Sequence, residues 1–303
     1  MKAGIIGAGH WGTKVVKEYI ALYDEKLLDS VVLCDLDNSR LKPFANAINT
    51  SSSIDETLNK VNMLHICTPN FTHYEIAKKA LESGVNVLIE KPMAEDVNHA
   101  FDLVKLSMSK GLILQVGHIF RFANIVRKIK QLYEEGEFGE IRYFNLSWTH
   151  LMPPMQNVDV VYDLLPHPID MLNFITDKWP LSFIGIGKFF RRTELIEVAS
   201  IEAVYDNFFA NIFLSWVSPQ RKRELELIGS KKGITADCVK QTATIYDGFE
   251  AQSINVDPNN TIRDEILNFI DAINTGKNDY NSSIVGARGI EMVNEAIKSI
   301  KLV

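Results

Sequence analysis

Short apolar runs alternate with helix-like segments through the first 118 residues, and this alternation limits the possible fold more than any other feature. The runs fall at 3–6, 31–34, 63–67, 85–89 and 112–116. The segments between them, at 14–22, 74–83 and 96–110, carry apolar residues at helical spacing. Strands that are apolar on both faces are typical of a parallel sheet covered by helices on each side. We therefore expect a doubly wound α/β domain over residues 1–118.

The pattern changes after residue 118. A basic helical segment at 123–135 is followed by strand-like runs at 141–149, 182–190, 201–216 and 223–228. Residues 223–227 alternate between polar and apolar side chains, which suits an antiparallel sheet with one solvated face. Helical patterns at 263–274 and 284–301 close the chain. We expect residues 119–303 to form an α+β domain with a mostly antiparallel, open sheet.

Gly7, Gly9 and Gly12 form a G-x-G-x-x-G motif between the first expected strand and the first helix. In a Rossmann domain the first glycine allows a tight turn, the second admits a pyrophosphate, and the third lets the helix pack closely. Glycine turns before helices are common in other folds too. Asp35, however, ends the second strand, where an acid hydrogen-bonds the ribose of a dinucleotide. Together these residues predict a Rossmann domain that binds NAD(P).

The side chains around the motif bear on the choice of cofactor. Asp35 favours NAD, because a carboxylate repels the 2′-phosphate of NADP. Arg40 leaves NADP open, since its guanidinium would partner that phosphate or else lie along the adenine or in water. His10 and Trp11 are expected to pack near the ribose. The Thr68-Pro69-Asn70 segment follows a strand, so its backbone is expected on the ribose side of the cofactor.

The chain resembles the glucose–fructose oxidoreductase / inositol dehydrogenase (Gfo/Idh/MocA) family over its whole length. The resemblance rests on the glycine motif, Thr68-Pro69-Asn70 with His73, Glu90-Lys91-Pro92, Gly117-His118, and Asp163 with His167. It implies hydride transfer between a nicotinamide and a secondary alcohol or ketone. It also implies that His73, Glu90 and Lys91 border the cofactor, and that the substrate is a sugar, an inositol or a nucleotide-sugar.

Lys91 is the first candidate catalytic residue, because it follows an apolar strand at its carboxyl end. In the family, the lysine of Glu-Lys-Pro reaches the oxygen of the reacting carbon. A cation beside a substrate hydroxyl stabilises the developing alkoxide, or holds a carbonyl ready for hydride. The alternative is a solvated surface lysine.

Asp163 and His167 match the catalytic pair of the family's second domain. An imidazole can take the hydroxyl proton, and a nearby carboxylate can fix its tautomer or bind substrate. The alternatives are that His167 only caps a helix and that Asp163 only starts a turn. Pro166 and Pro168 disfavour helical backbone in the residues before them. We therefore expect His167 to be a helix N-cap rather than a simple i, i+4 neighbour of Asp163. Whether His167 or the lysine carries the proton stays open.

Polar side chains outside the glycine loop supply the expected substrate contacts. They are His118, Arg121, His150, Tyr162, Asp163 and His167. The three consecutive basic residues at 221–223 would suit the phosphates of a nucleotide-sugar. A strand edge exposed to solvent would explain these basic residues as well. Two other functions are compatible with the motifs. One is a cofactor-binding regulatory protein without turnover, and the other is a reductase of a ring substrate that is not a sugar.

Composition excludes several other classes of protein. A net charge of −6 without a clustered basic face argues against nucleic-acid binding. Cys34, Cys67 and Cys238 are far apart, which argues against a disulfide framework and against a metal site. No apolar stretch approaches a membrane span, and the start does not resemble a signal peptide. We expect a cytoplasmic protein that binds neither metal nor membrane.

The open sheet of the second domain predicts self-association. Four large aromatic residues lie in or next to its expected strands: Phe208, Phe209, Phe213 and Trp216. Large apolar side chains on an exposed face are costly to leave in water. We therefore expect a homodimer or homotetramer that is joined through this sheet.

Overall fold

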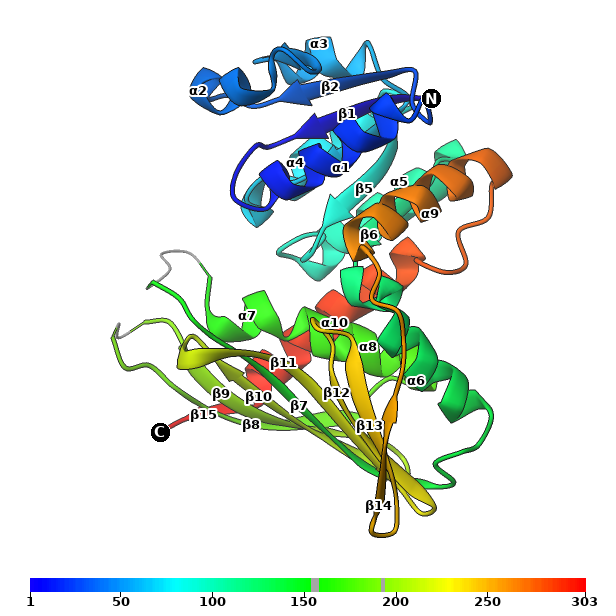
Figure 1. Ribbon diagram of the computed structural model, residues 1–303. Coiled ribbons are helices and arrows are strands. Elements are labelled where there is room, and N and C mark those ends of the chain that lie inside the picture. Colours follow the sequence, from blue (N-terminus) through cyan, green and yellow to red (C-terminus); the bar gives the residue numbers. More distant parts are fainter. Residues whose placement is uncertain (154–157, 192–193) are drawn as a thin grey trace. The chain divides into compact units, whose positions relative to one another are not determined.

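The computed structural model describes residues 1–153, 158–191 and 194–303 (Figure 1). The chain forms two compact units. The first contains Met1–His118 and Ile262–Ile290, and the second contains Ile119–Thr261 and Glu291–Val303. The expectation of one continuous second domain over 119–303 is therefore wrong for Ile262–Ile290. None of the described helices is long and apolar enough to cross a membrane.

The first unit is built on a six-stranded sheet in the order β3-β2-β1-β4-β5-β6. All its neighbouring strands are parallel. The strands are β1 (Lys2–Ile6), β2 (Ser30–Cys34), β3 (Asn49–Ser51), β4 (Met63–Ile66), β5 (Asn86–Glu90) and β6 (Leu114–Gly117). The strand order reverses between β1 and β4, and ligands of such sheets bind outside the carboxyl ends of the strands at this point. The predicted Rossmann domain is confirmed.

Two apolar cores cover the two faces of this sheet. The helices of the first unit are α1 (Gly12–Asp24), α2 (Asn38–Leu41), α3 (Ile54–Leu58), α4 (His73–Glu82), α5 (Val97–Lys110), α9 (Thr261–Thr275) and the start of α10 (Ser283–Ser299). Helices α4 and α5 supply one core, and α1 and α9 supply the other. Ile266 and Phe269 of α9 are fully buried in the second of these cores. This burial explains why a late segment of the chain belongs to the first unit.

The second unit is built on a nine-stranded sheet in the order β14-β13-β12-β11-β7-β10-β9-β8-β15. The β7/β10 and β8/β15 pairs are parallel and the other neighbours are antiparallel, as expected for a mostly antiparallel sheet. The strands are β7 (Ile141–Leu151), β8 (Ser182–Lys188), β9 (Val198–Val204), β10 (Phe209–Ser215), β11 (Val217–Gly229), β12 (Lys232–Asp237), β13 (Thr242–Asp247), β14 (Glu250–Ile254) and β15 (Ile300–Leu302).

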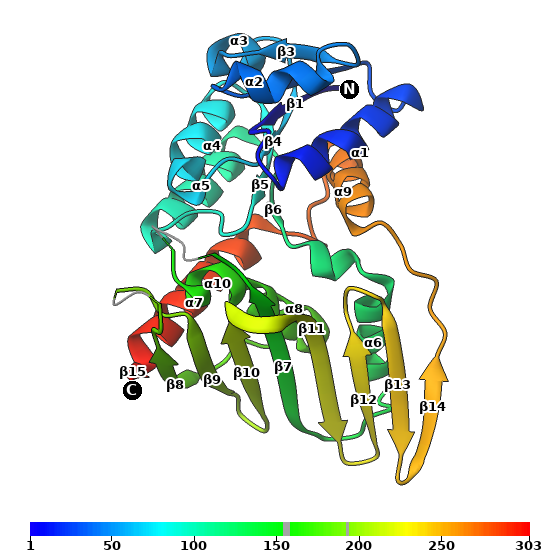
Figure 2. The ribbon, with the colours of Figure 1, turned by 60° about the vertical axis from the view of Figure 1, so that its left-hand side comes forward.

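Helices lie on one face of the second sheet and leave the other face open (Figure 2). They are α6 (Asn124–Glu134), α7 (Val160–Leu164), α8 (Pro166–Thr176) and the end of α10. Phe209 and Phe213 point to the open face, where they are 38 % and 43 % exposed. Phe208 and Trp216 are buried, so the expectation that all four aromatic residues serve the exposed face is wrong for these two. Successive strand residues point to opposite faces, which separates Phe208 from Phe209.

Candidate functional site

The glycine loop between β1 and α1 has the geometry of a dinucleotide cradle. Gly7 has a φ of +99°, and a Cβ there would lie 2.7 Å from the Cys67 carbonyl oxygen. A Cβ on Gly12 would lie 2.0 Å from the carbonyl oxygen of Gly7. A Cβ on Gly9 would meet nothing within 4 Å in the described chain. The tight turn at Gly7 and the close contact of the helix at Gly12 thus require glycine, while Gly9 leaves the loop surface open.

No side chain of the described residues caps the N-terminus of α1, although the Thr13 and Lys14 N–H groups donate to the carbonyl oxygens of Gly9 and Trp11. The N-cap residue Trp11 makes no capping hydrogen bond with its side chain, and the first turn of α1 contains no acidic residue. Backbone N–H groups at a helix N-terminus, together with the helix dipole, favour a negatively charged ligand such as a pyrophosphate. The residues present therefore fit a dinucleotide. In the same loop the His10 side chain is exposed, and the Trp11 side chain is half-buried.

Asp35 at the end of β2 joins two loops. Its Oδ2 accepts a hydrogen bond from the Ala8 N–H (2.7 Å), and its Oδ1 accepts one from the Asp37 N–H (2.9 Å). Arg40 is half exposed, with Nη1 3.8 Å from Asp35 Oδ2 and Nε 3.4 Å from Asp37 Oδ2. Asp35 thus fixes the glycine loop, and it places both an acid and a guanidinium where the sequence predicts the cofactor ribose.

His73 ties together two loops that the sequence assigns to the cofactor. Its Nδ1 lies 2.8 Å from the Pro92 carbonyl oxygen, and its Nε2 lies 2.9 Å from the Thr68 carbonyl oxygen. Burial lowers the pKa of His73, and the two carbonyls and Glu90 oppose this effect in part. His73 is buried and contacts the carbonyls of both loops, and its place beside the cofactor stays a prediction. Thr68 and Asn70 are half-buried and Pro69 is exposed.

Glu90 links the glycine loop to the strand end that carries Lys91. The Trp11 indole N–H donates a hydrogen bond to Glu90 Oε1 (2.5 Å), and His65 Nε2 donates to the same oxygen (3.3 Å). A Cβ on Gly117 would lie 2.8 Å from Glu90 Oε2, so β6 approaches the carboxylate closely. Lys91 itself is half-buried and follows β5 directly. These contacts hold Lys91 beside the cofactor loop within the first unit.

Ligand atoms of His65, Cys67 and Glu90 lie within 4.8 Å of one another, a spacing that could hold a metal ion. The sequence predicts no metal site, because its cysteines are far apart. Burial raises the pKa of the Cys67 thiol, and the negative charge of Glu90 raises it further. Because Glu90 Oε1 already accepts hydrogen bonds from Trp11 and His65, we interpret the His65–Glu90 contact as a hydrogen-bonded brace beneath the loop.

Asp163 and His167 lie on two helices that are almost continuous, contrary to the sequence-based expectation. Leu165 has helical dihedral angles of −61° and −32°, and α8 begins at Pro166. His167 is therefore inside the first helical turn and is not the N-cap. Proline is tolerated there because the first N–H groups of a helix have no partner within the helix. The backbone thus places Asp163 and His167 one helical turn apart.

Aromatic residues surround the Asp163–His167 pair. The Trp216 indole N–H donates a hydrogen bond to Asp163 Oδ2 (3.2 Å). The Phe120 ring packs edge-on against His167, with 5.1 Å between ring centroids. His167, Asp163 and Tyr162 are all half-buried, so their side chains remain reachable from solvent.

The remaining predicted substrate residues are divided between different environments. His150 on β7 is half-buried, and its Nδ1 accepts a hydrogen bond from Arg223 (3.2 Å). His118 is buried directly after β6 in the first unit. Arg121 is buried in an ion pair, with its Nε 2.7 Å from Asp170 Oδ1. Since this guanidinium is already neutralised, we leave Arg121 out of the proposed substrate site.

A hollow of about 820 Å³ lies on the open face of the second sheet. It is lined largely by polar side chains of β7, β10, β11 and β12, among them Asn145, Asn211 and Glu226. Asn211 donates to Asn145 (3.0 Å), and Asn145 donates in turn to Glu226 (2.5 Å). None of the predicted site residues lines this hollow. It belongs to the face expected to mediate association.

Comparison with protein families gives two consecutive matches. Residues 1–118 match the oxidoreductase family with an NAD-binding Rossmann fold, and residues 126–235 match the GFO/IDH/MocA C-terminal domain. Among curated proteins, the UDP-N-acetylglucosamine 3-dehydrogenase of Acidithiobacillus ferrooxidans is 24 % identical over 95 % of this chain and 93 % of that protein. Inositol 2-dehydrogenase 1 of Paenarthrobacter aurescens is 29 % identical over 59 % of this chain and 55 % of that protein.

Solved structures show the same architecture. The Acidithiobacillus ferrooxidans dehydrogenase superposes with a TM-score of 0.88 at 24 % identity, covering 99 % of this chain and 97 % of the other. A 3-ketoreductase from Actinomadura kijaniata, in complex with TDP-benzene and NADP, gives 0.89 at 19 % identity over 100 % and 98 %. At these identities the structures support the fold alone. With both family domains matched in order, the chain belongs to the Gfo/Idh/MocA family of NAD-binding oxidoreductases.

Proposed function

We propose that this protein oxidises or reduces a secondary alcohol or ketone of a sugar-like substrate with NAD. The Trp11–Glu90 hydrogen bond supports this most directly, because it ties the open glycine loop to the strand end that carries Lys91. The glycine loop and Lys91, a cation able to bind the substrate oxygen, are thereby linked within the first unit. The Acidithiobacillus and Paenarthrobacter relatives, named for a nucleotide-sugar and for inositol, support the substrate class.

The bound cofactor would accept the hydride as NAD in oxidation and supply it as NADH in reduction, and the chain's own residues would bind the substrate and move its proton. Lys91 donates a hydrogen bond to the reacting oxygen and stabilises negative charge there. His167 takes the hydroxyl proton in oxidation and returns it in reduction. Asp163, one helical turn away, is oriented by the Trp216 indole and holds the imidazole or a substrate hydroxyl. Tyr162 and His150 supply further substrate contacts, and His118 borders the cofactor end.

NAD is proposed over NADP because Asp35 is fixed at the end of β2 by two backbone N–H groups. A carboxylate held there hydrogen-bonds a ribose 2′-hydroxyl and repels a 2′-phosphate. Arg40 forms ion pairs with Asp35 and Asp37, which partly neutralise its charge. It would have to leave both acids before pairing with a phosphate.

We also propose that copies of the chain associate through the open sheet of the second unit. A second proposal is that the protein acts in the cytoplasm. Its three separated cysteines are free thiols, which a reducing compartment preserves. The exposed Phe209 and Phe213 supply the apolar part of the association surface.

The test compares NAD with NADP against a panel of sugars, inositols and nucleotide-sugars, for the wild type and for Lys91→Ala. We expect Lys91→Ala to lower kcat by about a hundredfold or more, within the usual range for a positioned proton-transfer or charge-stabilising group, and to leave NAD affinity unchanged. Lys105→Ala, at an exposed position of α5, is the matched control and should behave as the wild type.

Three outcomes would contradict the proposal. Full activity of Lys91→Ala would remove Lys91 from the mechanism. Tight NAD binding by the wild type, without turnover of any substrate in the panel, would favour the cofactor-binding regulatory protein. If an apolar ring ketone added to the panel were the one substrate turned over, this would favour the reductase of a non-sugar substrate.

A further inference from the structure

Arg223 is a buried cation in the second unit, and no carboxylate of the described residues forms an ion pair with it. It lies on β11 opposite Trp148 of β7, and it shares the inward face of the sheet with Leu225 and Leu227. The residue is 7 % exposed. It forms no ion pair with any carboxylate of the described chain, and residues 154–157, 192 and 193 contain neither Asp nor Glu. A buried charge that lacks a counterion is costly, so such an arrangement commonly serves a ligand.

The hydrogen bonds of Arg223 leave part of its guanidinium unused. Nη1 donates to the Thr149 carbonyl oxygen (3.0 Å) and to the Lys222 carbonyl oxygen (2.6 Å), and Nη2 donates to His150 Nδ1 (3.2 Å). A guanidinium carries five N–H groups, so the Nε hydrogen and one Nη2 hydrogen find no acceptor in the described residues. All three acceptors are uncharged, so they fix the orientation of the Arg223 guanidinium without neutralising its positive charge.

The electrostatic surroundings of Arg223 agree with an unpaired cation. Its pKa is lowered to about 10, chiefly by burial and also by the charge of Arg221, while Asp163 acts in the opposite direction. Asp163 thus acts on Arg223 from beyond ion-pair distance. Because even this pKa lies far above neutrality, the side chain remains charged at physiological pH.

Trp148 adds a second unused donor beside Arg223. The guanidinium carbon lies 5.9 Å from the centre of the indole ring. Trp148 is fully buried, and its Nε1–H has no acceptor among the described residues. Buried polar groups in native proteins are nearly always hydrogen-bonded, so an orphaned donor next to an unpaired guanidinium indicates a missing acceptor.

The Arg223–Trp148 pair is connected to the proposed catalytic residues. The Phe120 ring packs edge-on against Trp148, with 5.3 Å between centroids, and also against His167, at 5.1 Å. A continuous row of rings therefore runs from Arg223 to His167 within the second unit. A ligand group held by Arg223 would belong to the same molecule that His167 serves.

We propose that Arg223 and Trp148 form a subsite for an anionic oxygen group of the substrate, a phosphate or a carboxylate. This inference rests on the proposed function and narrows its substrate class to charged sugars. An anionic oxygen accepts from both unused donors and supplies the counterion that the buried guanidinium lacks. A neutral polyol would satisfy the hydrogen bonds but would leave the charge uncompensated.

The test measures binding by calorimetry to the NAD-saturated protein, which keeps anions out of the glycine loop. The probes are UDP-N-acetylglucosamine, D-glucuronate and myo-inositol, which separate phosphate, carboxylate and neutral ligands. We expect at least one charged probe to bind about tenfold or more tightly than myo-inositol. Arg223→Gln should weaken that probe by roughly tenfold to a hundredfold, the usual range for a hydrogen bond to a charged group. The affinity of this variant for myo-inositol should stay within twofold of the wild-type value.

Additional variants separate a binding role from a structural one. Arg223→Lys keeps the charge and should retain part of the affinity, and Trp148→Phe, which removes the N–H alone, should weaken the charged probe several-fold. Arg142→Gln removes an exposed arginine of β7 and should have no effect. If Arg223→Gln does not fold, the Lys and Phe variants decide, and unchanged affinity in both would overturn the proposal.

Equal weakening of charged and neutral probes by Arg223→Gln would also overturn the proposal, as would charged probes that bind no better than myo-inositol. These outcomes are read from binding, whereas the proposed function is read from turnover. A protein that discriminates charged probes through Arg223 but turns over no substrate would retain the subsite and lose the proposed reaction.

Discussion

Two glycines in the cofactor loop exclude a side chain for different local reasons. Gly7 combines a positive φ with close contact to the Cys67 carbonyl, whereas Gly12 is blocked by the Gly7 carbonyl as the helix begins. In both cases the nearest atom belongs to the backbone, which cannot move as a flexible side chain can. The loop therefore depends on these residues for its shape and on Gly9 for its open surface.

Gly12→Ala should unfold at a lower urea concentration than the wild type and bind NAD at least tenfold more weakly. Overpacking of this kind costs about 1–3 kcal/mol in well-packed sites. Gly289→Ala is the matched control, because a Cβ at this helical position of α10 meets nothing within 4 Å. It should stabilise the protein by about 0.5–1 kcal/mol. Similar unfolding midpoints for the two variants would contradict the steric argument.

The glycine loop, Asp35 and Lys91 are recognisable as candidate site residues in the sequence, whereas Arg223 stands there only within the basic run 221–223. The alternation in residues 223–227 puts Arg223 on the same side as Leu225 and Leu227, which are buried. This parity was the available signal that Arg223 points inward rather than into solvent. The absence of an acidic partner depends on neighbours distant in sequence, and only the folded chain shows it.

At the scale of elements, His73 braces the loops that follow β4 and β5. Its ring nitrogens lie against carbonyl oxygens of Thr68 and Pro92, and a neutral imidazole carries one N–H to share between them. The brace positions the segment that carries Lys91 without touching the expected substrate. His73 is thus a positioning residue, acting through the two loops.

The pKa of His73 predicts how stability changes with pH. Because burial lowers this pKa in the folded protein, the unfolded chain takes up a proton first as the pH falls below its ordinary value of about 6.5. The His73 contribution is therefore present above this pH and is lost on acidification. Glu90 raises the pKa of His73 and Lys91 lowers it, so both belong to the same electrostatic environment.

We expect the urea midpoint of the wild type to fall between pH 7.5 and pH 5.5 more steeply than that of His73→Gln. His10→Gln, which changes an exposed histidine, should keep the wild-type slope. Equal slopes for all three proteins would show that His73 does not titrate differently on folding. Measurements without NAD avoid coupling to cofactor binding.

The α7–α8 pair shows a limit of local rules at this scale. Proline chemistry disfavours helical backbone at Leu165, yet Leu165 is helical and the two helices run on almost without a break. Leu164, Leu165, Ile169 and Leu172 are buried, so packing outweighs the local preference. The spacing of Asp163 and His167 is consequently that of one helical turn.

At the scale of the whole molecule, the open sheet of the second unit combines polar and apolar surface. Cross-strand pairing puts Ile186, Ser200 and Phe213 in one row, and Val204 and Phe209 in another. Ile186, Phe209 and Phe213 are exposed beside the polar hollow. Such a mixture of apolar patches with hydrogen-bonding groups is usual for subunit interfaces.

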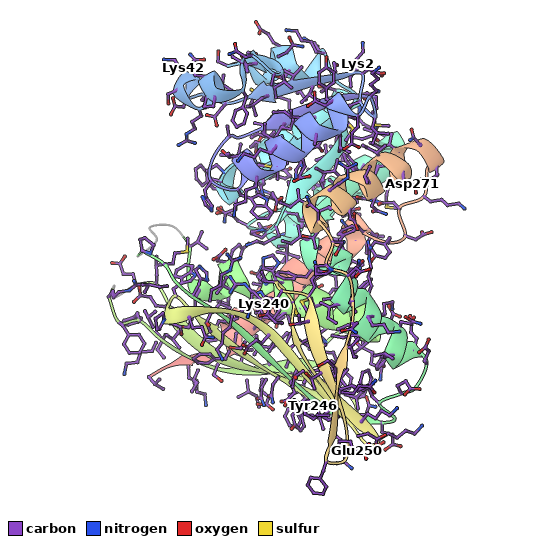
Figure 3. The ribbon with its side chains drawn as sticks, in the orientation of Figure 1. Lys2, Lys42, Lys240, Tyr246, Glu250 and Asp271 are labelled. Carbon is purple, nitrogen blue, oxygen red and sulfur yellow. The ribbon has the colours of Figure 1, made fainter. Side chains whose placement is uncertain are left out.

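Replacing both Phe209 and Phe213 by Ser should dissociate the proposed oligomer toward a monomer of 34.3 kDa. The reason is that both side chains would be buried only in the assembled form. Light scattering at micromolar concentration measures the mass directly. Phe249→Ser is the matched control, because Phe249 is fully exposed in the turn between β13 and β14. Figure 3 labels Tyr246 of β13 and Glu250 of β14, the two strands that this turn joins. A wild-type protein that is already monomeric would refute the association.

Local periodicity and local backbone geometry made several parts of this protein predictable from the amino-acid sequence alone. Apolar runs and helical spacing located the principal strands and helices, since burial of one face imposes a period on the chain. The glycine motif, with its restricted backbone, identified the cofactor loop. Short elements without a clear period escaped, such as β3 and β15. The last turn expected for α10 instead pairs with β8.

Only the tertiary structure decided which distant residues share an environment. It assigned α9 to the first unit, because Ile266 and Phe269 complete the core beside α1. It joined Trp11 to Glu90 and separated Arg121, which is neutralised by Asp170, from Arg223, which is not. Burial and electrostatic pairing depend on contacts between segments far apart in the chain, and a linear pattern does not contain them.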